Sequence, residues 1–167
     1  MMNPLASAVL ITWKRNAAYG RRLAEDLSAE QWVSQPVAGR VLNHPAWIFS
    51  HLNLYASVAG SLIRAEPFED PLGHRYGQNS RPEAGLSAYE APGQLLAVWS
   101  ELHESATAGL EKLPAGATSM PNPLERWRGA HPTVGDMLVT LMVKHESGHL
   151  GQLSAWRRAM GLPPVAV

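Results

Sequence analysis

Apolar residues recur at intervals of three and four along four stretches of the chain, and segments rich in proline and glycine separate these stretches. The spacing matches the 3.6 residues per turn of an α-helix with one buried face. It predicts helices over about residues 4–27, 45–65, 92–113 and 134–160. No stretch shows the alternation of a half-buried β-strand. The pattern therefore predicts an all-α protein built as a four-helix bundle.

Residues that start or stop helices lie at the ends of the second and the last stretch. Pro45 suits the first helical turn, and the residue before it can cap the helix. Thr133 and Asp136 have the spacing of a capping box. Gly161 followed by Pro163 is a usual helix end. These signals support both helices independently of the hydrophobic pattern.

Two of the predicted connections are long. Residues 67–91 and 114–132 contain several prolines and glycines and no helical pattern. A loop of that length in a compact domain is often functional. Long loops also allow crossover connections, so the helical pattern by itself leaves the order of up and down helices open.

The composition narrows the class of protein. The 167 residues are 46% hydrophobic and 17% charged, and we expect residues 1–167 to form a single globular domain. The 14 basic side chains balance 14 acidic ones, which argues against a nucleic-acid partner. The absence of cysteine excludes disulfides and thiolate ligands. No apolar run has the length of a membrane span and the start lacks a signal-peptide pattern, so we expect a cytoplasmic protein.

The candidate chemistry is concentrated in the last predicted helix. His145 and His149 are four residues apart, so they lie one turn above each other on the same face and form half of a zinc-type site. Two buried imidazoles would need partners for their ring nitrogens, and a metal ion supplies one. The predicted core stripe of this helix comprises Leu138, Met142, His145, His149, Gln152 and Trp156.

The same residues also spell His-Glu-x-x-His, the signature of zincin metalloproteases, in which Glu146 would be the general base. Zincins take a third ligand downstream, but no His, Asp or Glu follows His149. Glu146 lies about 100° around the helix from His145, so we expect it at the surface or at the rim of a site. The sequence therefore disfavours a protease.

A third metal ligand must come from upstream. His51 is favoured because it lies within a helix among apolar residues, where a bare imidazole needs a partner. His44 precedes a proline at a helix start, where capping or solvent exposure explains it. His103 stands beside two glutamates, which predicts an exposed face. His74 and His131 lie in the long loops and stay open as additional or gating groups.

These motifs, in this order, resemble the DinB/YfiT-like family of helical-bundle proteins, which are presumed metalloenzymes. The first mark is His51 in the second helix, followed by an apolar residue. The second is the pair His145 and His149, followed by Gly-Gln-Leu at 151–153, and a glycine-containing loop at 76–82 lies between them. The similarity extends from about residue 5 to residue 163.

The resemblance implies a bundle in up-down-down-up order and a divalent metal site, usually zinc or nickel, with His51, His145 and His149 as its ligands. It also implies a homodimer. Characterised relatives include thiol-dependent enzymes, such as bacillithiol transferases and a mycothiol-dependent maleylpyruvate isomerase. A low-molecular-weight thiol is therefore a further cofactor to consider.

Three neutral histidine ligands would leave a coordination position open, as in catalytic rather than structural zinc sites. A thiol or water bound there would lose its proton readily. The resulting hypothesis is a metal-dependent transferase or hydrolase that acts on electrophilic small molecules. Gln152 could orient a ligand or a histidine ring, or simply lie at the margin of the bundle. The alternative is a non-catalytic bundle stabilised by a metal, with a stress-related or interaction role.

Overall fold

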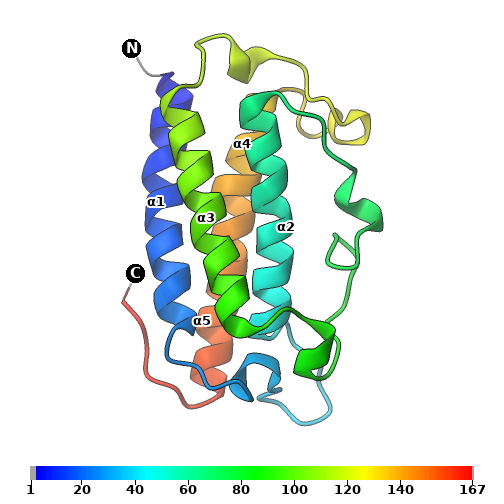
Figure 1. Ribbon diagram of the computed structural model, residues 1–167. Helices are drawn as coiled ribbons and strands as arrows, with labels where there is room; N and C mark the ends of the chain where they lie inside the picture. Colours follow the sequence, from blue (N-terminus) through cyan, green and yellow to red (C-terminus); the bar gives the residue numbers. More distant parts are fainter. Residues whose placement is uncertain (1–2, 167) are drawn as a thin grey trace.

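The computed structural model describes residues 3–166 and consists of four long helical rods joined by loops (Figure 1). The rods are α1 (Pro4–Ala24), α2 (Pro45–Arg64), α3 (Pro92–Glu111) and a last helix, in which α4 (Val134–Val139) continues through residues 140–145 into α5 (Glu146–Ala159). Short 3₁₀ turns occur in the loops, at Gln31–Val33, Pro71–Gly73, Leu86–Ala88, Ala117–Ser119 and Glu125–Trp127. Within residues 3–166 the β-pairing is one isolated bridge, Pro121–Thr133. The prediction of an all-α four-helix bundle is confirmed.

The rods have an up-down-down-up order. In the view of Figure 1, α1 and the last helix run from top to bottom, and α2 and α3 run from bottom to top. The antiparallel packing of α1 on α3 is visible in two hydrogen bonds, because Trp13 Nε1 donates to the carbonyl of His103 at 3.2 Å and Trp99 Nε1 donates to the carbonyl of Ala17 at 3.1 Å. This order agrees with the one that the family resemblance implies.

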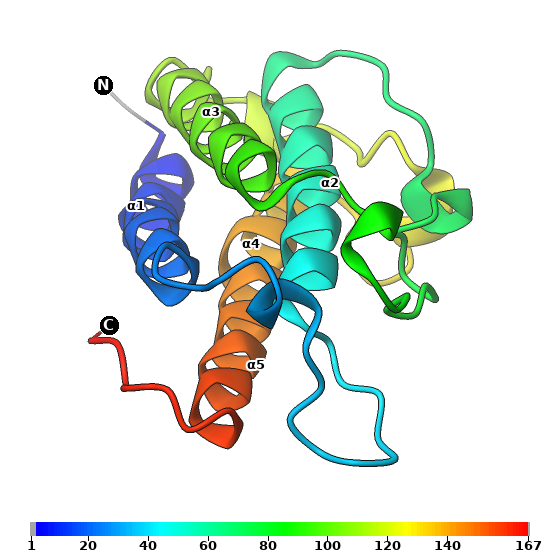
Figure 2. The same ribbon diagram turned by 60° about the horizontal axis from the view of Figure 1, so that its bottom comes forward.

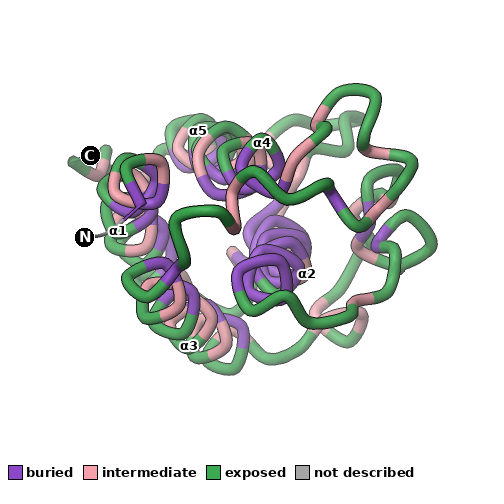
Figure 3. The backbone as a smooth tube through the Cα atoms, turned by 90° about the horizontal axis from the view of Figure 1, so that it is seen from above, coloured by how far each residue is buried: buried purple, intermediate pink, exposed green. Residues whose placement is uncertain are grey.

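α2 is the most deeply buried rod, with 17 of its 20 residues buried (Figure 3). α3 and the last helix pack on two of its sides, and the long loops 67–91 and 114–132 cover the side that faces away from α1 (Figure 2). A helix in this position buries nearly all its faces, which explains why its apolar residues exceed a single stripe. The loops therefore act as an additional wall of the core.

The predicted helix caps are present. Nδ1 of His44 accepts from the backbone N–H of Trp47, so this histidine caps α2. The alternative of solvent exposure for His44 is wrong, since its side chain is 1% exposed. Thr133 and Asp136 form the predicted capping box. Gly161 ends the last helix with a φ of 71°, a left-handed conformation that favours glycine.

The last helix contains a π turn, Thr140–His145, that the sequence did not reveal. The backbone N–H of Glu146 donates to the carbonyl of Leu141, five residues earlier. A π turn holds one residue more than an α turn, so every later residue is displaced by about 100° around the axis. The predicted core stripe is therefore wrong for His145, His149 and Gln152, whereas Trp156 is buried as predicted. The buried positions are Glu146, Leu150, Leu153, Trp156 and Arg157, whereas His145 and His149 are half-buried and Gln152 is exposed.

No helix among residues 3–166 is both long enough and apolar enough to cross a membrane.

Candidate metal centre

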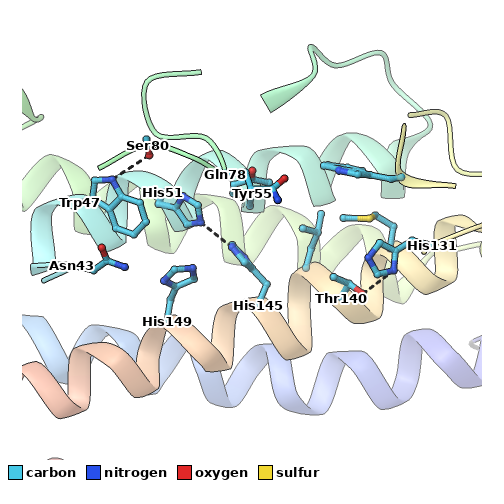
Figure 4. Close-up of a pocket in the computed structure, with 13 residues that line it drawn as sticks. Asn43, Trp47, His51, Tyr55, Gln78, Ser80, His131, Thr140, His145 and His149 are labelled. Carbon is cyan, nitrogen blue, oxygen red and sulfur yellow. Dashed lines mark hydrogen bonds between the residues drawn. The ribbon is translucent and has the colours of Figure 1, made fainter. Parts of the chain in front are cut away.

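Three imidazole rings converge between α2 and the last helix (Figure 4). His51 comes from α2, His145 ends the π turn and His149 lies in the first turn of α5. Each ring offers one nitrogen, and these nitrogens all lie within 4.8 Å of one another. The structure thus brings together the three histidines that the sequence singled out, and we call them the histidine cluster.

The histidine cluster forms one wall of an open cavity of about 450 Å³. α2 contributes Trp47 and Tyr55, and the last helix contributes Met137, Thr140 and Leu141. Both long loops also contribute: Gln78 and Ser80 come from residues 67–91, and Trp127 and His131 come from residues 114–132. The two loops therefore border the candidate site.

Two of the three rings have a fixed tautomer. Nδ1–H of His51 donates to the carbonyl of Tyr76 at 2.6 Å, and Nδ1–H of His149 donates to Oε1 of Gln152 at 3.1 Å. The same Oε1 accepts from Nδ2 of Asn43 at 3.0 Å, which holds the Gln152 amide in place. A neutral imidazole with its proton on Nδ1 carries a lone pair on Nε2. His51 and His149 can therefore bind a metal through Nε2. Gln152 orients the ring of His149, which is one of the roles predicted for it.

One ring nitrogen of His145 has no partner among the described residues, and the other closely approaches a second histidine. Its Nε2 lies 2.8 Å from Nε2 of His51, and its buried Nδ1 has no hydrogen-bond partner among the described residues. Two nitrogen lone pairs at this separation repel each other unless a proton or a cation lies between them. Buried polar atoms without partners are rare and need an explanation. A cation held between the two Nε2 atoms would remove their repulsion, so the donor set fits a divalent metal, while Nδ1 of His145 needs a partner of its own.

The pKa values of the three histidines also favour metal binding. Burial, reinforced by the charge of His149, lowers the pKa of His51 to about 4. Burial, with the charges of His149 and His51, lowers the pKa of His145 to about 3. Burial also lowers the pKa of His149. All three rings are therefore neutral near pH 7, which is the form that binds metal ions.

The loop 67–91 holds His51 by its backbone. A Cβ atom on Gly77 would lie 2.1 Å from the carbonyl oxygen of Pro71, so this tight fold accepts only glycine. The fold places the Tyr76 carbonyl on His51. Trp47 stacks on His51 with ring centroids 4.6 Å apart and donates from Nε1 to Ser80 Oγ at 3.2 Å. The glycine in the 76–82 motif was the sequence signal for this support.

Two expectations about charged residues are wrong. His103 and Glu146 were expected at the surface or rim, but they are 3% and 2% exposed. Glu146 Oε2 lies 3.1 Å from Nε2 of His103, and Nδ1–H of His103 donates to the carbonyl of Trp99 at 2.8 Å. Trp13 and Trp99 each lie 3.9 Å from the His103 ring, centroid to centroid. The π turn explains the burial of Glu146, since it turns that residue into the core.

This buried pair also bears on the protease alternative. The Glu146 carboxyl points into the core between α1 and α3, and it does not line the cavity. A zincin general base must reach a water at the metal. Glu146 cannot do so in this fold.

The remaining histidines take separate places. Nε2–H of His44 donates to the carbonyl of Glu83 at 3.1 Å, so its ring serves the helix cap and a loop. His74 is exposed in loop 67–91 and does not line the cavity. His131 lines the cavity at the end away from His149 (Figure 4). Sequence reasoning left His131 open and missed Asn43, whose role depends on a contact between distant segments.

A helical bundle with three neutral histidines around an open cavity defines a class of protein able to bind a metal. Comparison with known families identifies the class more closely, since residues 12–153 match the DinB superfamily. The chain therefore belongs to the DinB superfamily, and the match covers all three histidines and both long loops. Searches of curated proteins and of solved structures found no significant match.

Proposed function

We propose that this protein is a metal-dependent enzyme that joins a thiol to an electrophilic small molecule or hydrolyses such a molecule. The supporting observation is the set of three neutral imidazoles that present nitrogens to an open cavity. Three protein ligands leave a position for an exchangeable ligand, as in catalytic zinc sites. The ion proposed is zinc or nickel.

A divalent ion in this position would act as a Lewis acid and lower the pKa of a thiol or water that coordinates to it. The protein's own contribution is to hold the ligands. His51 is held by the Tyr76 carbonyl, and His149 is held by Gln152 and, through it, Asn43. Partners of this kind fix the ring orientation and raise the basicity of the ligating nitrogen.

The charge of the cavity supports an anionic ligand. Among the described residues that line it there is no aspartate or glutamate. Three neutral imidazoles would leave the full charge of a divalent ion uncompensated by the protein. A thiolate or hydroxide would compensate this charge, and the site would favour it over a neutral ligand.

The choice of a thiol rests on resemblance. Thiol-dependent enzymes are among the characterised members of the family that the sequence resembles, and this chain belongs to that superfamily. The non-catalytic alternative would use the metal only to join α2 to the last helix. The cavity beside the cluster favours a catalytic role, because a purely structural zinc site is closed by four protein ligands.

Metal analysis of untagged protein tests the proposal. We expect about one divalent ion per chain, and its loss in His51→Ala and in His149→Ala. His44→Asn is the matched control, because it lies on the same helix as His51, keeps a capping side chain and does not line the cavity. Retention of the ion in both alanine variants would refute the ligand assignment. Thiol-dependent conjugation of monochlorobimane distinguishes an enzyme from a non-catalytic bundle. An enzyme should catalyse this conjugation, and the activity should disappear when the metal is removed.

The remaining partner predictions are tested by other measurements. A homodimer, a cytoplasmic location and the lack of nucleic-acid binding stay predictions. Sedimentation equilibrium checks the first, fractionation of cells checks the second and a DNA-binding assay at low salt checks the third.

A further inference from the structure

The cavity has a second polar end that the proposed chemistry does not use. The histidine cluster lies at one end, and His131 lies at the other, beside Thr140 (Figure 4). Trp127 also lines the cavity. Thr140 precedes His145 by five residues, which corresponds to roughly 7 Å along a helix axis. The two ends are therefore within reach of one small molecule.

The backbone around His131 is fixed by a buried side chain. Asn122 is 0% exposed, and its Nδ2 donates to the carbonyl of His131 at 3.1 Å. Its Oδ1 accepts from the backbone N–H of Leu124 at 3.0 Å, and its own N–H donates to the carbonyl of Pro132 at 2.9 Å. His131 N–H in turn donates to the carbonyl of Trp127 at 2.7 Å. These hydrogen bonds fix the backbone of loop 114–132 where it places the His131 side chain in the cavity.

The ring of His131 is also oriented. Its Nδ1 lies 3.2 Å from Oγ1 of Thr140, whose hydroxyl has no other hydrogen-bond partner among the described residues. A threonine hydroxyl can donate to Nδ1 or accept from Nδ1–H, and when it donates, the ring proton is on Nε2. The second ring nitrogen faces the cavity rather than the last helix (Figure 4). In that tautomer His131 offers a hydrogen-bond donor, and an acceptor bound at this end would select it.

Trp127 forms a flat apolar wall at the same end. Phe68 stacks against it with ring centroids 6.5 Å apart, and the Arg126 guanidinium lies 4.8 Å from the centre of its ring. Arg126 is itself held by an ion pair with Asp70. These contacts tie the two long loops together, so the wall is held from both sides.

Hydrogen-bond donors on a cavity wall whose described lining residues include no carboxylate select acceptors and anions. We infer that His131 binds a carboxylate on a substrate whose thiol occupies the histidine cluster, so that the cavity selects mercaptocarboxylates over neutral thiols. The inference rests on the proposed function and adds a substrate class to it. The Nε2–H group of His131 donates to the carboxylate, and Trp127 covers the carbon chain between the two groups. His131 is then a specificity-determining residue.

The test uses the full-length protein loaded with Co²⁺ and a ladder of thiol probes. The probes are mercaptoacetate, mercaptopropionate, mercaptobutyrate and mercaptohexanoate, each paired with the mercaptoalcohol of equal length. Binding is followed by the sulfur-to-cobalt charge-transfer band, which needs no enzymatic turnover. We expect one of the longer acids to bind roughly tenfold more tightly than its alcohol, as fits one hydrogen bond to a charged group.

Variants at the far end complete the test. His131→Leu should remove the roughly tenfold preference by weakening the binding of acids more than that of alcohols, whereas His131→Gln should retain part of it because the amide still donates. Thr140→Val should weaken the preference, since the ring loses its orienting partner. Cobalt stoichiometry and thermal unfolding confirm that each variant is folded and loaded.

The outcomes separate the two proposals. A charge-transfer band with all thiols, but equal affinity for acids and alcohols at every length, overturns the role of His131 and leaves the proposed function intact. A preference that persists in His131→Leu also overturns it. If no probe produces the band in cobalt-loaded protein, the thiol-dependent function itself fails.

Discussion

A single buried histidine, His103, and the histidine cluster lie on opposite sides of the last helix, and their surroundings differ. On the core side, both ring nitrogens of His103 have protein partners, the Trp99 carbonyl and Glu146. On the cavity side, His145 has a buried Nδ1 without a partner and an Nε2 that faces another Nε2. His145 and Glu146 are adjacent in the chain, yet they serve different surroundings.

The comparison shows how a structural histidine differs from a candidate ligand. Burial is similar in kind, since His51 is 4% exposed and His103 is 3% exposed. The difference lies in hydrogen-bond satisfaction and in the nearby carboxylate. His103 has a buried carboxyl beside it, and burial raises the pKa of Glu146, so the pair can share one proton internally. Among the described residues that line its cavity the histidine cluster has no acidic partner, and it fits an external cation instead.

The largest effect should come from breaking the core-side pair. Glu146→Leu leaves His103 Nε2 buried without a partner, and removal of one member of a buried pair costs about 3–5 kcal/mol of unfolding free energy. Glu146→Gln keeps a hydrogen-bonding group and should cost less. Urea unfolding measures the loss. Both variants should still bind one metal ion per chain below their unfolding temperature; if Glu146→Gln loses the metal, the His103–Glu146 pair and the histidine cluster are not independent.

A pH-dependent loss of stability is expected in the metal-free protein. The folded-state pKa values of His51 and His145, about 4 and about 3, lie below the usual 6.5. The unfolded chain therefore takes up more protons below pH 6.5, and stability falls as the pH drops from about 6.5 toward 4. Each ring contributes a slope of roughly 1.4 kcal/mol per pH unit in that window.

Urea unfolding at pH 7 and pH 5, in the presence of a chelator, checks this dependence. His145→Gln removes one of the titrating rings and should reduce the slope by about the contribution of one proton. An equal slope in the variant and the parent would show that His145 is not held neutral by its surroundings.

The smallest effect should come from Gln152→Ala. This change removes the acceptor for Nδ1–H of His149 but leaves all three ligands in place. Loss of such an orienting partner typically weakens metal binding by about 10–100-fold. Competition with a chromogenic chelator measures the affinity, and the unfolding free energy should hardly change because Gln152 is exposed. Asn43→Ala should produce a weaker shift in the same direction, because it acts on His149 through Gln152.

Local sequence signals predicted the four helices, the caps of the second and the last helix, and the two long loops, because hydrophobic periodicity, proline and glycine act on the conformation of neighbouring residues. They also predicted that His145 and His149 share a face. Residues four apart lie on the same side of a helix, whichever side packs against the core. The favoured third histidine, His51, followed from its place among apolar neighbours.

Tertiary structure alone decided which face of the last helix meets the core. The π turn shifts the residues after Met142 around the helix axis by about one residue position. No local residue preference predicts this turn. This displacement placed Glu146 against His103 and turned the histidine pair toward the cavity. The Tyr76 carbonyl, Asn43 and His131 likewise depend on contacts between segments far apart in the chain. The physical reason is that helix formation is determined by near neighbours, whereas the rotation of a helix is set by what it packs against.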